Sequence, residues 1–151
     1  MKKLLTTLGI FASLFTASAL AEDWKTVEQE ANGETVYFHA WGGSQEINRY
    51  IQWAANELKA RYNVTLKHVK VTDISETTTR LLAEKAADKN TGGSVDMVWI
   101  NGENFYSAKE NGFLYGPFTD KLPNYDQYLD TAAAESQYDF GNPIEGFEAP
   151  Y

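Results

Sequence analysis

The chain has 151 residues, enough for one domain with a hydrophobic core, and its formal net charge is −8. It contains no cysteine, which excludes disulfide bonds, thiolate-bound metals and a cysteine nucleophile. Because an acidic surface repels phosphate backbones, the composition also argues against nucleic acid as a partner.

The first 21 residues have the organisation of a secretory signal peptide. Lys2 and Lys3 form a basic start, residues 4–15 are an apolar run, and Ala19-Leu20-Ala21 fits a small-x-small cleavage site. The apolar run is too short to span a membrane. We predict cleavage after Ala21 and export to the periplasm as a chain that does not span the membrane. Without Lys2 and Lys3, 11 basic and 21 acidic residues remain.

Residues 22–34 are polar and are expected to form a lead-in with a short helical turn. The next stretch, residues 35–44, reads Thr-Val-Tyr-Phe-His-Ala-Trp-Gly-Gly-Ser. Its β-branched, aromatic and small residues predict a strand buried on both faces, as in a parallel sheet. Gly42-Gly43 predicts a turn, and Ser44 is a suitable cap for a helix over residues 45–62. Asn63 is suited to ending that helix.

Two further strands and two further helices follow. Residues 64–71 predict a strand with a bulge or with exposure on one side, because the positions of its apolar residues change parity. Asp73 and Glu76 are spaced as a capping pair for a helix that ends near Lys89. The apolar face of this helix is expected to consist of Leu81, Leu82 and Ala86. A strand over residues 95–100 and a short helix over residues 104–111 complete an α/β fold with a mostly parallel sheet flanked by helices.

From Gly112 onward the periodicity weakens, and the pattern predicts loops and short turns. Residues 105–151 nevertheless carry 11 of the 21 aromatic residues, so we expect a large, partly apolar surface to be covered there. The chain ends at residue 151 in what reads as the start of an extended element. We therefore expect it to be a truncated piece of a longer protein.

Several motifs together resemble those of a known family. They are the Trp-Gly-Gly-Ser turn, Val-Asp-Met-Val-Trp-Ile-Asn-Gly at residues 95–102, Asn-Gly-Phe-Leu-Tyr at residues 111–115 and Glu-Gly-Phe-Glu-Ala-Pro-Tyr at residues 145–151. With the signal peptide, they resemble the periplasmic solute-binding proteins of bacterial ABC importers, in the branch that includes thiamine, iron and polyamine binders.

The resemblance implies a fold of two α/β lobes joined by hinge strands. Residues 22–151 would then be the amino-terminal part of the first lobe of a periplasmic-binding-protein-like fold, truncated near the hinge, with the second lobe absent. The implied function is capture of a small solute by a monomer that delivers it to the importer's permease in the inner membrane. No cofactor and no catalysed reaction are implied.

The turn after the first strand is the leading candidate for ligand binding. Gly42 and Gly43 allow close approach to the backbone, Ser44 offers a hydroxyl, and Trp41 offers a face for stacking. The alternative is that the glycines only form a tight turn and that Trp41 packs in the core. The position after a parallel strand favours binding.

Asn101, Gly102 and Glu103 occupy the equivalent place after the third strand and are further candidates. The alternative is that Asn101 or Gly102 caps the next helix and that Glu103 complements its dipole. Asp73, after the second strand, is interpreted as a cap. By the resemblance, Tyr151 lies at the hinge and faces the solute.

The chain lacks the signatures of an enzyme or a metal site. His39 reads as a core residue and His68 as part of an exposed strand, and nothing near them has ligand spacing. No nucleophile elbow, zinc-protease motif, phosphate loop or dinucleotide fingerprint occurs. Two alternatives to solute binding remain: a secreted α/β hydrolase whose catalytic half is missing, and a non-functional truncated fragment. The charge of the solute stays open, because acidic and aromatic residues favour cations whereas helix starts favour anions.

Overall fold

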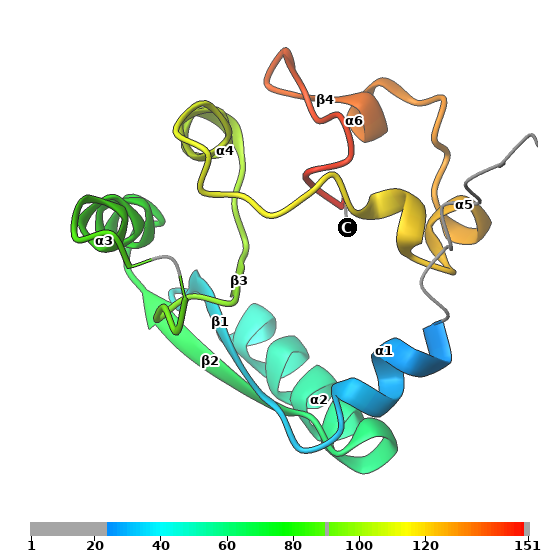
Figure 1. Ribbon diagram of the computed structural model, residues 1–151. Helices are drawn as coiled ribbons and strands as arrows, with labels where there is room; N and C mark the ends of the chain where they lie inside the picture. Colours follow the sequence, from blue (N-terminus) through cyan, green and yellow to red (C-terminus); the bar gives the residue numbers. More distant parts are fainter. Residues whose placement is uncertain (1–23, 90, 150–151) are drawn as a thin grey trace, which may run out of the picture.

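The computed structural model describes residues 24–89 and 91–149 (Figure 1). The predicted signal peptide, residues 1–21, and the predicted ligand residue Tyr151 lie outside the described residues. Among the described helices, none has both the length and the apolar character needed to cross a membrane. In chain order the elements are α1 (Trp24–Glu30), β1 (Thr35–Trp41), α2 (Gln45–Tyr62), β2 (Thr65–Val71), α3 (Ser75–Ala86), β3 (Met97–Val98), α4 (Gly102–Glu110), the 3-10 helix η1 (Thr119–Lys121), α5 (Tyr125–Tyr128), α6 (Ala134–Gln137), β4 (Tyr138–Asp139) and β5 (Asn142–Pro143).

The main sheet has three parallel strands in the order β2-β1-β3. The prediction of an α/β fold with a parallel sheet flanked by helices is confirmed. Strands β1 and β2 pair without interruption from Thr35–Thr65 to Trp41–Val71, so of the two expected alternatives, a bulge or exposure, the bulge does not occur. The change of parity instead leaves Lys67 and Lys70 exposed along β2.

Strand β3 is shorter than predicted, because only Met97 and Val98 are assigned to it rather than residues 95–100. Just before β3, the carboxylate of Asp96 accepts a hydrogen bond from the backbone N–H of Tyr37 at 2.8 Å. A side chain therefore occupies a donor of β1 that a regular strand would have paired with its backbone.

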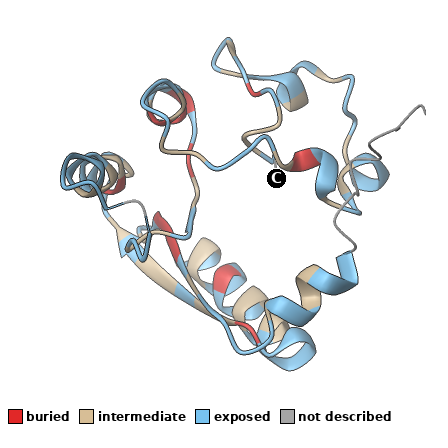
Figure 2. Cartoon of the chain, in the orientation of Figure 1, coloured by how far each residue is buried: buried red, intermediate tan, exposed pale blue. Residues whose placement is uncertain are grey.

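Helix α2 has the predicted bounds, and local interactions explain both ends. Ser44 has an extended backbone and its hydroxyl accepts a hydrogen bond from the N–H of Ile47 at 3.3 Å, as an N-cap does. Asn63 ends the helix in the left-handed conformation, with φ of 55°. One side of α2 covers the sheet, where Ile51 packs with Phe38 and Ala40 in a buried cluster (Figure 2).

The opposite face of β1 carries the buried His39, which is 2% exposed. Its Nε2 lies 3.0 Å from the carbonyl oxygen of Ser94, and its Nδ1 lies 3.0 Å from the hydroxyl of Thr77 in α3. Because a carbonyl only accepts, Nε2 donates to Ser94, and Nδ1 accepts from Thr77. The prediction that His39 is a satisfied core residue is confirmed.

Helix α3 begins as predicted but ends earlier and buries a different face. The carboxylate of Glu76 accepts from the N–H of Asp73 at 3.0 Å, and the carboxylate of Asp73 accepts from the N–H of Ser75 at 2.8 Å. The helix ends at Ala86 rather than near Lys89. The predicted apolar face is wrong, because Leu82 is 54% exposed and Ala86 is exposed, whereas Thr77 is buried.

A second buried cluster joins α4 to the carboxyl-terminal part of the chain. Phe105 and Ala108 of α4 pack with Ile100 and with Ile144. Ile144 follows an antiparallel pair, β4 and β5, in a region for which the sequence predicted only loops and turns. The helix α4 itself starts at Gly102, two residues before the predicted start.

Replacing Thr77 by valine, which has nearly the same shape, should destabilise the fold by removing the donor to His39. A buried acceptor that loses its partner costs about 1–3 kcal/mol, which corresponds to a fall in Tm of roughly 5–10 °C for a domain of this size. Thermal unfolding followed by circular dichroism measures this effect. Thr79→Val, at an exposed position of the same helix, is the matched control, and an equal loss of stability in both variants would contradict the role of Thr77.

Candidate functional site

The candidate site is the edge of the sheet at which the parallel strands end. The chain leaves β1 into α2, which packs on the face that holds Phe38 and Ala40. It leaves β3 into α4, which contacts α3 on the face of His39 (Figure 1). The loops after the adjacent strands β1 and β3 therefore diverge to opposite faces. In open α/β sheets, ligands bind in the crevice between two such loops.

We call residues 41–44 and 101–103 together the strand-end rim. The first group begins at Trp41, the last residue of β1, and the second follows the carboxyl end of β3. All seven residues predicted for these two loops thus lie at one edge of the same sheet. Their role in binding a ligand stays a prediction.

Trp41 lies over the turn that it introduces. Its side chain is 48% exposed, and a Cβ atom added to Gly43 would meet the indole Cζ2 at 2.2 Å. A Cβ added to Gly42 would meet the Cβ of Lys70 at 2.8 Å. Any side chain at either position would collide with these neighbours, so both positions require glycine. The indole lies at the rim with a substantial part of its surface in solvent rather than in the core.

The first turn of α2 is held by side-chain hydrogen bonds within the rim. Besides the Ser44 cap, the Nδ2 of Asn48 donates to the carbonyl of Gly42 at 2.9 Å. The Oδ1 of Asn48 is buried and has no hydrogen-bond partner in the described part of the chain. Sequence reasoning did not single out Asn48, although its place four residues after the cap is a signal that could have found it.

In the loop after β3, two of the three candidate residues are exposed to a ligand and one is buried. Asn101 is exposed, occupies the N-cap position of α4 and makes no capping hydrogen bond with its side chain. Glu103 is exposed in the first turn, where its charge complements the helix dipole. Gly102 is buried and has φ of 59°, a conformation that suits glycine.

The β4–β5 hairpin covers Gly102. The carboxylate of Asp139 accepts a hydrogen bond from the N–H of Gly102, and the ring of Phe140 lies 3.6 Å from the position that a Cβ of Gly102 would take. A carboxylate of the chain itself thus occupies the positive end of α4. Sequence reasoning missed Asp139, and the Asp-Phe-Gly-Asn turn at residues 139–142 was the signal available.

Lys109 attaches the same hairpin to the other end of α4. Its ammonium group donates to the carbonyl of Pro143 at 2.7 Å and pairs with the carboxylate of Glu145. Ile144, between these two partners, is 2% exposed in the cluster with Phe105. Polar contacts at both ends of α4 and an apolar contact between them therefore hold the hairpin in place.

Glu148 is the ionisable side chain most strongly perturbed near this hairpin. Burial, and secondarily the negative charge of Asp139, raise the pKa of Glu148 from 4.5 to about 7. The Oε2 atom of Glu148 is buried without a hydrogen-bond partner in the described residues. At neutral pH, ionisation of Glu148 therefore places a second negative charge near the carboxylate that caps α4.

Glu148 should make the stability of the protein fall as pH rises. Because its pKa is higher in the folded than in the unfolded chain, the folded state binds more protons between about pH 4.5 and 7, and the free energy of unfolding decreases across that window. Glu148→Gln should therefore raise Tm at pH 8 and change it little at pH 4. Thermal unfolding at several pH values measures this, with Glu34→Gln, at an exposed position outside the helices, as the control; a Tm difference that does not depend on pH would contradict the assignment.

The described residues contain no group of three or more His, Asp or Glu side chains placed to hold a metal ion. His68 packs against Phe38, with ring centroids 6.3 Å apart, and its Nε2 lies 3.3 Å from the carbonyl oxygen of Ala40. Burial lowers the pKa of His68, because it disfavours the charged form of the ring. His68 is thus partly buried rather than exposed, and it serves packing.

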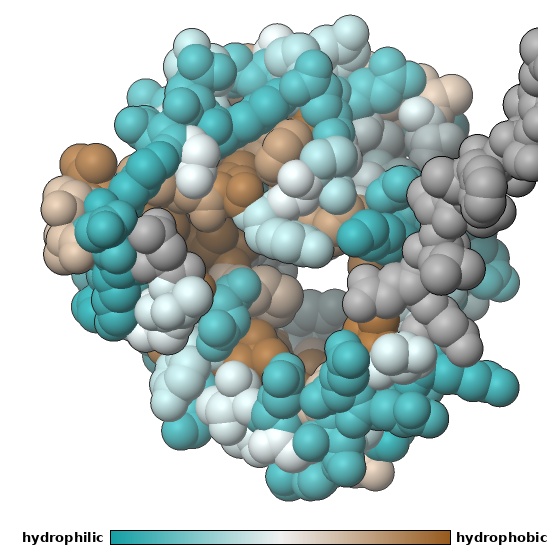
Figure 3. All heavy atoms as spheres, in the orientation of Figure 1, coloured by the Kyte–Doolittle hydropathy of each residue, from teal (hydrophilic) through white to brown (hydrophobic). Residues whose placement is uncertain are grey.

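A space-filling view shows how open this region is. The face in view is hollowed between α4 and the sheet, with hydrophobic residues gathered on the wall of the hollow and hydrophilic residues on its outer margin (Figure 3). Several large side chains of the chain are exposed in agreement with this, among them Trp41, Met97 and Phe140. The apolar surface beside the strand-end rim is therefore accessible.

Comparison with known proteins finds a relative in Escherichia coli but no matching family model. The chain is 42% identical over 144 residues to Protein YnjB of Escherichia coli (strain K12). The match covers 95% of this chain but 36% of the relative, so the chain spans about a third of the length of the curated relative it matches. No family model matches the chain, and no solved structure matches it.

These comparisons correct the family assignment made from the motifs. The chain resembles the periplasmic solute-binding proteins in short motifs, but no model of that family matches it. The relative that covers the chain has a name that gives no function. The motifs at residues 95–102, 111–115 and 145–151 are short patterns of apolar, glycine and turn residues, which many α/β chains share. The assignment to that family is therefore wrong.

Proposed function

We propose that this chain forms one side of a cleft that captures a small solute in the periplasm and presents it to the permease of an ABC importer. The site supports a cleft, and the predicted signal peptide supports export to the periplasm. Its main support is the divergence of the loops after β1 and β3 to opposite faces of a parallel sheet. In this proposal the chain performs no chemical reaction.

The composition of the strand-end rim supports binding of a small molecule. Trp41 supplies a half-exposed indole face, the start of α2 supplies backbone N–H groups and a hydroxyl, and Asn101 supplies an exposed amide. A few polar groups beside an apolar surface are the usual composition of a small-molecule site. The ring of Trp41 is suited to stack on a flat or cationic group of the solute.

The proposal includes a second lobe that closes over the rim. The E. coli relative is longer than this chain, which spans 36% of it. In this proposal the further length supplies the opposite side of the cleft, and hinge closure traps the solute in a form that the permease recognises. A periplasmic-binding-protein-like arrangement of two lobes is the fold that this mechanism requires.

A solute that binds at the rim should raise the melting temperature of the protein. The experiment is a thermal-shift screen of a protein that carries the proposed second lobe, against thiamine, polyamines, ferric complexes, sugars and oxyanions. At a concentration 100 times its Kd, a ligand stabilises the folded state by about 2.7 kcal/mol, which raises Tm by several degrees. A broad screen without any stabilising solute would contradict the proposal, as would turnover of one of these compounds.

The rim is tested with a matched pair of tryptophan variants. Trp41 and Trp53 are 48% and 56% exposed, but Trp53 lies on α2 beside Tyr50, away from the strand-end rim. Trp41→Ala should weaken binding of the solute found in the screen by about tenfold or more, since loss of one stacked ring removes about 1–2 kcal/mol. Trp53→Ala should leave the affinity unchanged, and calorimetric titration measures both. An equal effect of the two variants would place the solute elsewhere.

A further inference from the structure

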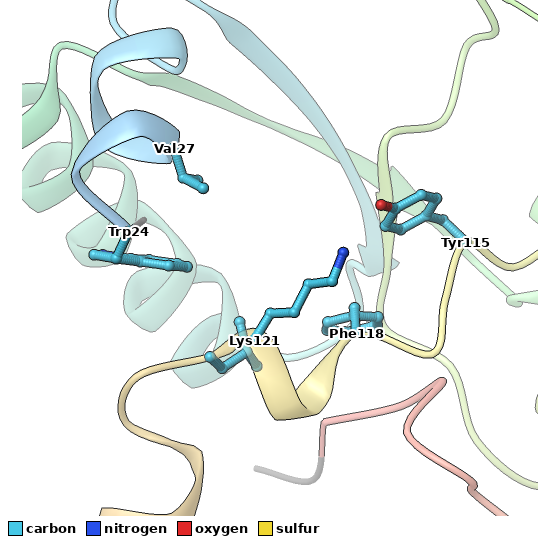
Figure 4. Close-up of a pocket in the computed structure, with 6 residues that line it drawn as sticks. Trp24, Val27, Tyr115, Phe118 and Lys121 are labelled. Carbon is cyan, nitrogen blue, oxygen red and sulfur yellow. The ribbon is translucent and has the colours of Figure 1, made fainter. Parts of the chain in front are cut away.

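A pocket of about 250 Å³ lies between α1 and the segment of residues 115–122, and it shares no residue with the strand-end rim. Trp24 and Val27 of α1 form one side (Figure 4). Tyr115, Phe118, Lys121 and Leu122 form the other. The two sides are about 90 residues apart in the sequence, so only the fold brings them together. No function proposed above makes use of this pocket.

The lining of the pocket is apolar except for one cation. Three of its residues are aromatic, and the stem of Lys121 runs between Trp24 and Phe118, with its ammonium group at the centre of the space (Figure 4). In the described part of the chain, the ammonium group of Lys121 makes no hydrogen bond or ion pair, and the residue's backbone N–H donates to the carbonyl of Phe118 at 3.0 Å. An ammonium group among aromatic rings and without a carboxylate partner is a binding point for an anion.

The size and the walls of the pocket limit the ligand further. Pockets for drug-sized molecules usually have about 300–1,000 Å³, so about 250 Å³ fits a single ring with a short substituent. Stacking against Trp24 and Phe118 favours an aromatic ring. Tyr115 is 79% exposed, and its hydroxyl is turned toward the pocket, where it can donate to an acceptor (Figure 4).

We propose that this pocket is a second binding site, which takes a monocyclic aromatic carboxylate. The ring lies against Trp24 and Phe118, the carboxylate pairs with Lys121, and Tyr115 donates a hydrogen bond. The net charge of −8 does not prevent this. At physiological ionic strength, charges more than about 8 Å away are largely screened, so the nearby ammonium group dominates.

The test titrates the purified chain with benzoate and phenylacetate and follows the indole N–H signal of Trp24 by NMR. The signal is assigned by its loss in Trp24→Phe. Benzoate should move this signal, whereas benzamide, its neutral counterpart, should bind at least about tenfold more weakly, because a hydrogen bond to a charged group contributes about 1.5–3 kcal/mol. Equal binding of benzoate and benzamide, or no binding of either acid, would overturn the proposal.

Variants at Lys121 separate charge from packing. Lys121→Met keeps the length of the stem and should lower the benzoate affinity by about tenfold, while Lys121→Arg should restore it. Lys67→Met removes an exposed lysine on β2 and should change nothing. An unchanged affinity in Lys121→Met would overturn the proposal. Movement of the Trp41 signal in place of that of Trp24 would also overturn it, although the proposed capture of solute at the rim would stand.

Discussion

The buried hydrogen bonds of His39 are the constraint on which the arrangement of the sheet depends. They connect the central strand to α3 through Thr77 and to the segment before β3 through Ser94. On the other face of the same strand, Phe38 and Ala40 pack against Ile51 of α2. One strand thus fixes a helix on each face, by polar contacts on one side and apolar contacts on the other. The divergence of the loops at the strand-end rim follows from this difference between the faces.

Elements specified by neighbouring residues could be predicted from the sequence. The bounds of α2 follow from the Ser44 cap, the left-handed Asn63 and the spacing of its apolar residues, all within 20 residues of one another. The parallel order of the strands follows from the alternation of strands and helices. The rim residues could be placed for the same reason, since the carboxyl ends of parallel strands share one edge.

Features that depend on distant residues could not be predicted. Burial of Thr77 in α3 depends on His39, which is 38 positions away, so the helix buries a polar residue while Leu82 stays exposed. The strands β4 and β5 have two residues each, too few for any periodicity, and the partner of Asp139 is 37 positions away. The pocket beside Lys121 combines α1 with residues 115–122, and neither segment alone indicates it.

The carboxylate of Asp139 has a consequence for any molecule that approaches the start of α4. Because the N–H of Gly102 already has a charged acceptor, an anionic group can use this helix end only by competing with a part of the same polypeptide. The apparent affinity is then the intrinsic affinity multiplied by the fraction of molecules in which the β4–β5 hairpin has moved aside. A cationic group meets the opposite situation, since the covered helix end presents a negative charge to it. The hairpin thereby disfavours anionic groups and favours cationic groups on this side of the sheet.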